Sequence, residues 1–473
     1  WSGFARGADL WVRGLAALRN GDLIAGGSFS AIGGRAAKRI ARWDGSEWAP
    51  LGQGVTSTSG STVRAIVETP TGDVIAGGEF LAMGGIAANH VARWDGANWS
   101  ALGSGVSGGT SHVYALAALD NGDVIVGGLF TAAGGVAGTA AIARWDGASW
   151  SSIGGVGVSG RVYALAKLPG GDLVAGGWFA SAGGTTAASI ARWNGSTWSA
   201  FGGGIAGAVY AIAILPNGDL IAAGDFTMAG GAPAANIARW DGATWSALGA
   251  GTDLTIRALT VLPNGDVLAG GAFTLAGGVA CNRVARWDGS AWSPIETGMD
   301  RDVYGLTTTG DGSVFAGGDF LVAGGRAASY VTKLETSCPA IVTSSGGCPS
   351  SGGNNLLVAS AAPWIGSTLR TAASGLPQLA VTFAITGLAV QSLPLAALTP
   401  LAPPGCVLLV STDAVEFVPT GNGAASWQLA VPNSVTFAGV VLRHQMVPSE
   451  LDAFGNLVEV TATNALVLTI GAY

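Results

Sequence analysis

The sequence predicts an all-β chain: a β-propeller of seven four-stranded blades, followed by a small β-sandwich. Three observations predict this fold. A Gly-rich unit with two Trp residues recurs at steps of 47 to 51 residues through most of the chain. Of the 473 residues, 78 are Gly and only 11% are charged, a composition typical of strands and turns. Beyond residue 336 the repeat stops, and short alternating strands separated by Pro/Gly turns follow.

Four strands can be identified within one unit. In the third unit the first strand is Val113–Leu116, and the turn Asn121–Asp123 reverses the chain into the second strand, Val124–Val126. After a Gly/Ala loop the third strand is Ile142–Trp145, and an Asp-Gly turn leads to the fourth at Trp150. Four antiparallel strands in each of several successive units describe the blades of a propeller.

The two ends of the repeat set the number of blades. The fourth-strand motif, Trp-Ser-x-x-Gly or a close variant, opens the chain at Trp1 and recurs at Trp48, Trp99, Trp150, Trp198, Trp245 and Trp292. The last unit, 303–335, has three strands and lacks the fourth. We therefore expect residues 1–4 to pair with residues 331–335, which completes the seventh blade and leaves fewer open sheet edges.

The repeat phrase resembles those of known propellers. Each unit reads approximately Gly-Gly-x-Phe-x-x-Ala-Gly-Gly, then Ile-Ala-Arg-Trp-Asp-Gly-x-x-Trp-x-x-Leu-Gly. A Gly-Gly strand end followed by spaced aromatic residues resembles the kelch family. The fuller phrase is similar to repeats of secreted bacterial proteins and of the fungal cortical marker for cell polarity. The resemblance covers residues 1 to about 336 and implies a propeller in a secreted, extracellular or cell-surface setting, with no implied reaction.

The expected domains are a propeller at 1–336, a Ser/Gly/Pro linker at 337–353 and a β-sandwich at 354–473. The last domain resembles C-terminal domains of secreted bacterial repeat proteins through its closing phrase, Thr463–Gly471. Its expected strands include Leu379–Ile385, Cys406–Ser411, Ser426–Val431, Val435–Leu442 and Leu466–Ile470.

The linker contains two of the four cysteines. Cys338 and Cys348 flank a short Gly/Ser loop, a spacing that suits a disulfide in an oxidising compartment. A zinc site is the alternative, but no His lies near this pair in sequence. Cys281 and Cys406 could be buried thiols or a second bridge.

The sequence gives no pattern for catalysis, a cofactor or a metal. The three histidines, His90, His112 and His444, lack metal-ligand spacing, and no nucleophile-elbow motif is present. The net charge is −7 and the basic residues are not clustered, which argues against nucleic acid as a partner. No apolar run reaches the ~20 residues of a membrane span. We therefore predict a protein that is not an enzyme and has no transmembrane segment.

Several repeated residues have structural interpretations. The repeat Trp side chains should fill the wedges between blades. The Asp of each Asp-Gly turn should bond its own backbone. The Arg before each third-strand Trp should form hydrogen bonds with backbone carbonyls or with a turn Asp. The alternative is that these Arg residues bind an acidic ligand.

One ring of residues is the best candidate ligand site. The first strand of every repeat has Arg or Tyr at the same position. These residues are Arg13, Arg64, Tyr114, Tyr163, Tyr210, Arg257 and Tyr304. If these strands line the central channel, the ring either binds a small molecule or fills the pore. Trp178 breaks the repeat pattern of Trp and is expected to be exposed, so it is a further candidate.

Two functions remain open on this sequence. Only seven charged residues lie between Pro339 and Tyr473, so part of the second domain is expected to be covered. This favours a self-assembling structural subunit of a cell-surface coat, sheath or filament, whose copies meet through the second domain. The alternative is a lectin-like or adhesin propeller that binds glycans or other surface proteins.

Overall fold

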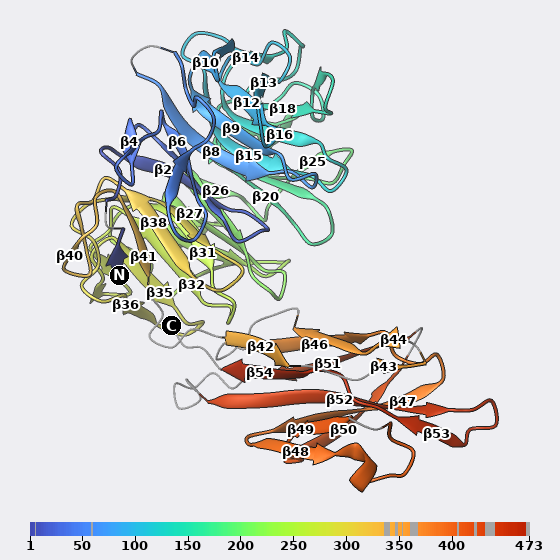
Figure 1. The fold of residues 1–473 in the computed structure, drawn as a ribbon. Coiled ribbons are helices and arrows are strands. Elements are labelled where there is room, and N and C mark those ends of the chain that lie inside the picture. The colour runs from blue at the N-terminus through green and yellow to red at the C-terminus, as the bar shows by residue number, and fades with distance from the viewer. Residues whose placement is uncertain are drawn as a thin grey trace. The chain divides into compact units, whose positions relative to one another are not determined.

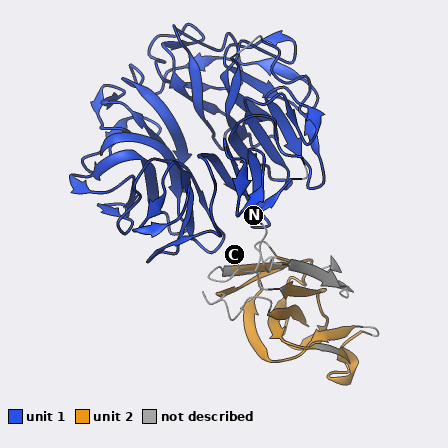
Figure 2. Ribbon diagram, turned by 90° about the vertical axis from the view of Figure 1, so that its left-hand side faces the viewer, with its two compact units in different colours: residues 1–335 blue, residues 336–473 orange. Residues whose placement is uncertain are grey.

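A computed structural model describes residues 1–4, 6–57, 60–334, 341–345, 349–351, 353–359, 368–403, 406–420, 423–430 and 440–469. The chain divides into two compact units, Trp1–Glu335 and Thr336–Tyr473 (Figure 2). Both are built from strands, and within the described ranges the one helical element is the single turn η1 (Leu395–Ala397). No helix among these residues is long and apolar enough to cross a membrane.

Unit 1 contains seven antiparallel sheets that repeat one strand order (Figure 1). The first sheet runs β2 (Val12–Ala17), β3 (Leu23–Gly27), β6 (Ile40–Trp43) and β7 (Trp48–Pro50). The next five begin with β8 (Thr62–Glu68), β15 (His112–Ala118), β20 (Arg161–Lys167), β26 (Ile205–Ile214) and β31 (Ile256–Val261). Their second strands are β9 (Val74–Glu79), β16 (Val124–Leu129), β21 (Leu173–Trp178), β27 (Leu220–Ala229) and β32 (Val267–Gly271).

The third and fourth strands of these five sheets begin at the repeat motifs. The third strands are β12 (Val91–Trp94), β18 (Ile142–Trp145), β24 (Ile190–Trp193), β29 (Ile237–Trp240) and β35 (Val284–Trp287). The fourth are β13 (Trp99–Ala101), β19 (Trp150–Ser151), β25 (Trp198–Ala200), β30 (Trp245–Ala247) and β36 (Trp292–Pro294). The strands that the sequence predicted in the third unit are therefore present.

The seventh sheet joins the two ends of unit 1. It runs β37 (Val303–Thr308), β38 (Val314–Gly318), β41 (Val331–Leu334) and β1 (Ser2–Gly3). Ser2 is the partner of Lys333 and Gly3 is the partner of Thr332. The predicted pairing of residues 1–4 with the last repeat is confirmed. Trp1 is only 1% exposed, as a fourth-strand Trp should be.

The first strands of successive sheets contact one another in a cycle. The contacts run from β2 through β8, β15, β20, β26 and β31 to β37, and β37 in turn contacts β2. Each first strand is an edge of its own sheet, so the other strands lie outward from this inner set. The sheets are thus arranged radially, as in a β-propeller.

Glycine permits the close approach of neighbouring sheets. A Cβ placed on Gly26 would lie 2.6 Å from Cγ1 of Val63 in the next sheet. The same clash would occur between Gly317 of the last sheet and Val12 of the first, again at 2.6 Å. The equivalent pairs are Gly77 with Val113, Gly127 with Val162, Gly176 with Val209 and Gly270 with Val303. In six of the seven sheets the first Gly of the repeated Gly-Gly pair therefore sets the spacing to the next sheet, and in the fifth sheet the buried Ala223 occupies this position.

Five of the seven fourth-strand Trp residues bond to the preceding sheet, whereas the indole nitrogens of Trp1 and Trp48 are buried without a partner among the described residues. The indole N–H of Trp99 donates to the carbonyl of Leu51 at 2.9 Å, and that of Trp150 donates to Leu102 at 2.8 Å. Equivalent bonds are donated by Trp198, Trp245 and Trp292. All seven of these side chains are buried. The predicted structural role of the repeat Trp is confirmed, with a hydrogen bond that the sequence did not indicate.

The Gly/Ala loop between the second and third strands contains short hairpins that the sequence analysis did not predict. They are β4 (Ala31–Ile32) with β5 (Arg35–Ala36), β10 (Ala82–Met83) with β11 (Ile86–Ala87), β22 (Ser181–Ala182) with β23 (Thr185–Thr186), β33 (Leu275–Ala276) with β34 (Val279–Ala280), and β39 (Val322–Ala323) with β40 (Arg326–Ala327). Gly33 and Gly34 both have positive φ, which is the requirement of a two-residue hairpin turn.

Unit 2 has a large sheet with a core on each face. This sheet runs β42 (Ile341–Ser345), β54 (Ala465–Thr469), β52 (Val441–Leu451), β47 (Ala380–Gly387) and β50 (Ala414–Pro419), and β53 (Leu457–Val460) pairs with β52. One face packs on β45 (Leu356–Ala359), β46 (Thr368–Ser374) and β51 (Ala424–Ala430) through side chains such as Leu369 and Met446. The other packs on η1 and the hairpin β48 (Val390–Pro394) with β49 (Val407–Val410).

Unit 2 agrees only in part with its predicted strands. Four of the five predicted strands coincide with β47, β49, β51 and β54. Most of the fifth, 435–442, lies outside the described residues, and β52 begins only at Val441. β52 was not predicted because it contains Pro448, which cannot donate to a sheet. β42 lies within the range 337–353 that the sequence assigned to a linker, and it pairs with β54.

The cysteines fall into two groups. Cys281 is a buried free thiol, whereas Cys406 is buried and disulfide-bonded. Cys338 and Cys348, the pair predicted to form a disulfide, lie outside the described residues.

The Gly–Val approach gives a prediction for stability. In the variant Gly77→Ala the new Cβ would lie 2.4 Å from Cγ1 of Val113, so we expect urea unfolding to show a loss of about 1–3 kcal/mol from overpacking. Gly170→Ala is the control, because Gly170 has no atom within 4 Å of that position and should tolerate the change. Equal unfolding midpoints for the two variants would contradict this account.

Candidate functional site

The candidate ring is positioned by seven β-bulges. In each sheet the register between the first and second strands shifts around one residue, for example between Val113 and Ala115 in β15. The residues at these shifts are Arg13, Arg64, Tyr114, Tyr163, Tyr210, Arg257 and Tyr304. A bulge leaves one residue without a partner on the neighbouring strand and redirects its side chain. All seven predicted ring residues therefore share one distinctive backbone position.

One half of the ring is aromatic. The ring of Tyr163 lies between those of Tyr114 and Tyr210, with centroid separations of 5.2 and 4.9 Å. The Arg64 guanidinium lies over Tyr114, 5.6 Å from its centroid. These separations are within the range of favourable aromatic and cation–π contacts.

The other half of the ring is cationic. Tyr304 lies between Arg13 and Arg257, whose guanidinium carbons are 4.8 and 5.7 Å from its ring centroid. The strand of Arg13, β2, contacts the strand of Arg64, β8, and β26 with Tyr210 contacts β31 with Arg257, so the two halves are adjacent. Arg257 is exposed and the other ring residues are half-buried. The structure therefore brings all seven predicted residues together in one partly accessible ring.

Carboxylates balance some of these charges. Arg64 donates from Nε to Glu79 Oε1 at 2.6 Å, and His112 Nδ1 lies 3.2 Å from the same oxygen. Asp302 lies 3.4 Å from Nε of Arg257. Sequence reasoning missed these acids because they occupy different repeat positions, the end of the second strand for Glu79 and the start of the first for Asp302.

Burial shifts the pKa values of three phenols of the ring. Burial raises the pKa of Tyr114, Tyr210 and Tyr304, and the Asp319 carboxyl adds to the shift of Tyr304. The phenols therefore stay protonated at neutral pH and can donate hydrogen bonds to a ligand.

Trp178 extends the aromatic half. Its indole is 61% exposed, and the Arg161 guanidinium lies over it at 5.8 Å. Arg161 also donates to the hydroxyl of Tyr163 at 3.3 Å. The predicted exposure of Trp178 is confirmed, and Arg161 links it to the ring.

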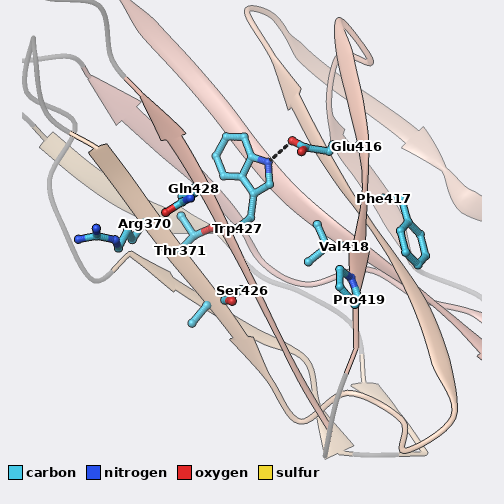
Figure 3. Close-up of a pocket in the computed structure, with 10 residues that line it drawn as sticks. Arg370, Thr371, Glu416, Phe417, Val418, Pro419, Ser426, Trp427 and Gln428 are labelled. Atoms are coloured by element: carbon cyan, nitrogen blue, oxygen red, sulfur yellow. Dashed lines mark hydrogen bonds between the residues drawn. The ribbon is translucent and has the colours of Figure 1, made fainter.

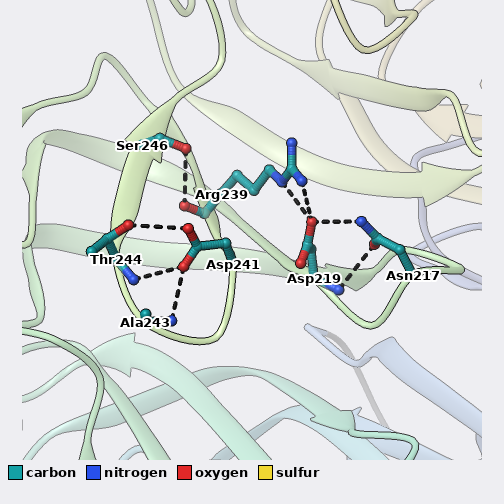
Figure 4. A network of polar contacts seen from close by, with 7 residues as sticks. All are labelled: Asn217, Asp219, Arg239, Asp241, Ala243, Thr244 and Ser246. Carbon is teal, nitrogen blue, oxygen red and sulfur yellow. Dashed lines mark hydrogen bonds and ion pairs between the residues drawn. The ribbon is translucent and has the colours of Figure 1, made fainter.

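The repeat Arg and Asp residues are engaged with one another or with the backbone (Figure 4). Arg239 donates to Asp219 of the preceding hairpin turn at 2.7 Å. Asp241 accepts bonds from the backbone N–H groups of Ala243 and Thr244 at 2.8 and 2.7 Å. Equivalent ion pairs are Arg42–Asp22, Arg93–Asp73, Arg144–Asp123, Arg192–Asp172 and Arg286–Asp266. These contacts confirm the structural interpretations, because the guanidiniums already have carboxylate partners.

Unit 2 has a pocket of its own, of about 510 Å³ (Figure 3). It lies between β50 and the strands β46 and β51, and Trp427 crosses it to donate to Glu416 at 2.6 Å. Behind Trp427, the His444 imidazole stacks on the indole at 4.2 Å and contacts the hydroxyls of Thr371 and Thr386. His444 is fully buried, so it supports the core rather than facing a ligand.

The described residues contain no group of three or more His, Cys, Asp or Glu that could hold a metal ion. The three histidines lie in different environments. His112 lies beside Glu79 near the ring, and His444 is in unit 2. His90 lies in a loop before β12 and has a positive φ.

The comparisons with known proteins give only distant likenesses. No family model and no curated protein matches this chain. Among solved structures it is similar to the WD40 β-propeller domain of Doa1, at 14% identity and a TM-score of 0.44, over 67% of this chain and 93% of that one. It is also similar to the extracellular domain of BT4673 from B. thetaiotaomicron, at 11% identity and a TM-score of 0.43, over 100% of this chain and 59% of that one. Likenesses at this level identify no ligand or activity.

The buried histidine predicts how the stability of unit 2 depends on pH. Burial lowers the pKa of His444 to about 4 from its ordinary value of 6.5, so unit 2 is most stable above pH 6.5. As the pH falls from 6.5 to 4, the unfolded chain binds a proton that the folded one resists, and the loss of stability reaches about 3 kcal/mol near pH 4. We expect a histidine NMR resonance that titrates near pH 4 and is lost in His444→Gln. A midpoint near 6.5 for that resonance would show that the imidazole is not buried.

Proposed function

We propose that this chain is an extracellular, secreted binding protein, and not an enzyme. In this proposal unit 1 is a seven-bladed propeller of the kelch-like kind, unit 2 is a β-sandwich, and the ligand binds at the ring of bulged Arg and Tyr side chains. The observation that carries the proposal is the ring itself. Its side chains come from seven separate sheets, contact one another and remain partly accessible.

The composition of the ring favours a saccharide as the ligand class. Tyr rings and an exposed Trp provide flat surfaces on which the apolar face of a sugar can stack, and phenols and guanidiniums donate hydrogen bonds to its oxygens. Pore filling is the competing role, but a side chain that only fills a pore needs neither charge nor partial exposure. Saccharide binding corresponds to the lectin-like function that the sequence analysis gave as the alternative. We now propose it ahead of self-assembly.

Binding to a saccharide array tests this proposal. We expect at least one probe to bind the full chain, and Tyr163→Ala to weaken binding by about tenfold, because that change removes two aromatic contacts. Phe454→Ala is the control, since Phe454 is 91% exposed on a turn of unit 2. If no saccharide binds, or if both variants bind as well as the unchanged chain, the ring is not a saccharide site.

Self-assembly is a second function, supported by one edge of unit 2. β50 is the outer strand of its sheet and pairs only with β47 among the described residues. Val415 and Phe417 on this strand are 56% and 57% exposed, and Phe417 contacts Phe383 of β47 at 6.3 Å. An exposed apolar edge strand favours pairing with another chain. A second copy of this chain is the proposed partner, as expected for a coat, sheath or filament subunit.

Light scattering on the full chain tests assembly. We expect a mass above that of the 46.7 kDa monomer at micromolar concentration. The variant Phe417→Lys should restore the monomer, because a charge on an edge strand opposes pairing. Phe454→Lys adds the same charge on a turn away from β50 and should leave assembly unchanged. A monomer mass for the unchanged chain would remove this second function.

A further inference from the structure

Arg13 differs from the other cations of the ring in its aromatic surroundings. Its guanidinium carbon lies 4.9 Å from the ring centroid of Trp11 and 4.8 Å from that of Tyr304, whereas Arg64 and Arg257 each lie over one ring. Both distances are within the range of favourable cation–π contacts. The N–H donors lie in the plane of the guanidinium, so an anion binds best at its edge.

Arg13 also lacks a counter-ion. Within the described part of unit 1 no carboxylate oxygen forms an ion pair with it, whereas Arg64 and Arg257 each have one. Its Nε atom is buried without a hydrogen-bond partner. Burial, together with the charges of Arg64 and Arg257, lowers the pKa of Arg13. A partly buried cation beside two like charges is unfavourable unless an anion joins it.

The nearby carboxylates do not supply that anion. Glu79 is bonded to Arg64, and Asp302 lies between Arg257 and Arg283, at 3.4 and 3.6 Å. Burial and the charge of Asp302 raise the pKa of Asp319. Among the described residues Arg13 is therefore the one ring cation without a carboxylate at ion-pair distance, and only the charge of Glu79 acts on it from further away. Its aromatic neighbours are Trp11 and Tyr304.

We propose that Arg13 binds the carboxylate of an acidic saccharide, while the tyrosines of the ring contact the sugar. A ring cation without an ion-pair partner points to a ligand that carries a negative charge. The planar edge of a guanidinium matches a carboxylate, with which it can form two parallel N–H···O bonds. This inference rests on the proposed binding function of the ring and specifies the ligand that the ring accepts.

Calorimetry with a hexuronic acid and its methyl ester tests the inference, since the two differ in one charge. We expect the full chain to bind the acid at least tenfold more tightly than the ester. Arg13→Gln should abolish this preference, and Arg13→Lys should retain part of it. Arg35→Gln is the matched control, because Arg35 is an exposed residue that pairs with Glu47. Equal binding of acid and ester would overturn the anionic ligand while leaving the ring as a saccharide site. Failure of every acidic saccharide to bind would overturn the inference itself.

Thermal unfolding separates binding from pore filling without any ligand. Arg13→Gln removes an uncompensated charge, so its unfolding midpoint should equal or exceed that of the unchanged chain. Arg64→Gln leaves Glu79 without its closest cation and should lower the midpoint. If Arg13→Gln is destabilised as much as Arg64→Gln, Arg13 is a structural part of the pore and the proposal is wrong.

Discussion

The contact between a small residue of one sheet and an apolar side chain of the next is the constraint on which unit 1 depends. In six sheets the small residue is a glycine that meets a valine, and in the fifth it is Ala223. At Gly77 even a methyl group would lie 2.4 Å from Val113, so these sheets can approach this closely only without a side chain there. The same contact between Gly317 and Val12 joins the last sheet to the first. Because adjacent sheets meet along their first strands, small residues in the second strands determine how near those inner strands come.

The candidate site follows from that spacing. Each first strand bulges opposite the Gly-Gly pair, and the bulged residue lies among the inner strands that form a cycle. Because the repeat places one bulge in every sheet, the ring requires no special loop or inserted element. Its chemistry varies with the residue at each bulge and with neighbours such as Glu79 and Arg161. Tyr rings of successive sheets contact one another, as Tyr163 does with Tyr210, whereas Arg13 and Arg64 bring like charges near each other.

The repeat made most of unit 1 predictable. Asn-Gly-Asp turns and the paired Trp residues located the four strands, and the unmatched Trp1 located the strand that completes the seventh sheet. The bulges and the ion pair of Glu79 with Arg64 were not predictable, because both depend on register between strands. Unit 2 was harder because it has no repeat. Its long strand Val441–Leu451 contains a proline and interior polar residues, which conceal the period-two pattern.

Cysteine cross-linking tests the closure of unit 1 most directly. With Ser2→Cys and Lys333→Cys together, the two positions are partners on adjacent strands, at a separation suited to a disulfide. Oxidation of the folded chain should join the two peptides, as read by mass spectrometry. Ser2→Cys with Arg286→Cys, the equivalent position in the sixth sheet, should remain unlinked. A cross-link to position 286 in place of 333, or to neither, would contradict the seven-sheet ring and the site that it encloses.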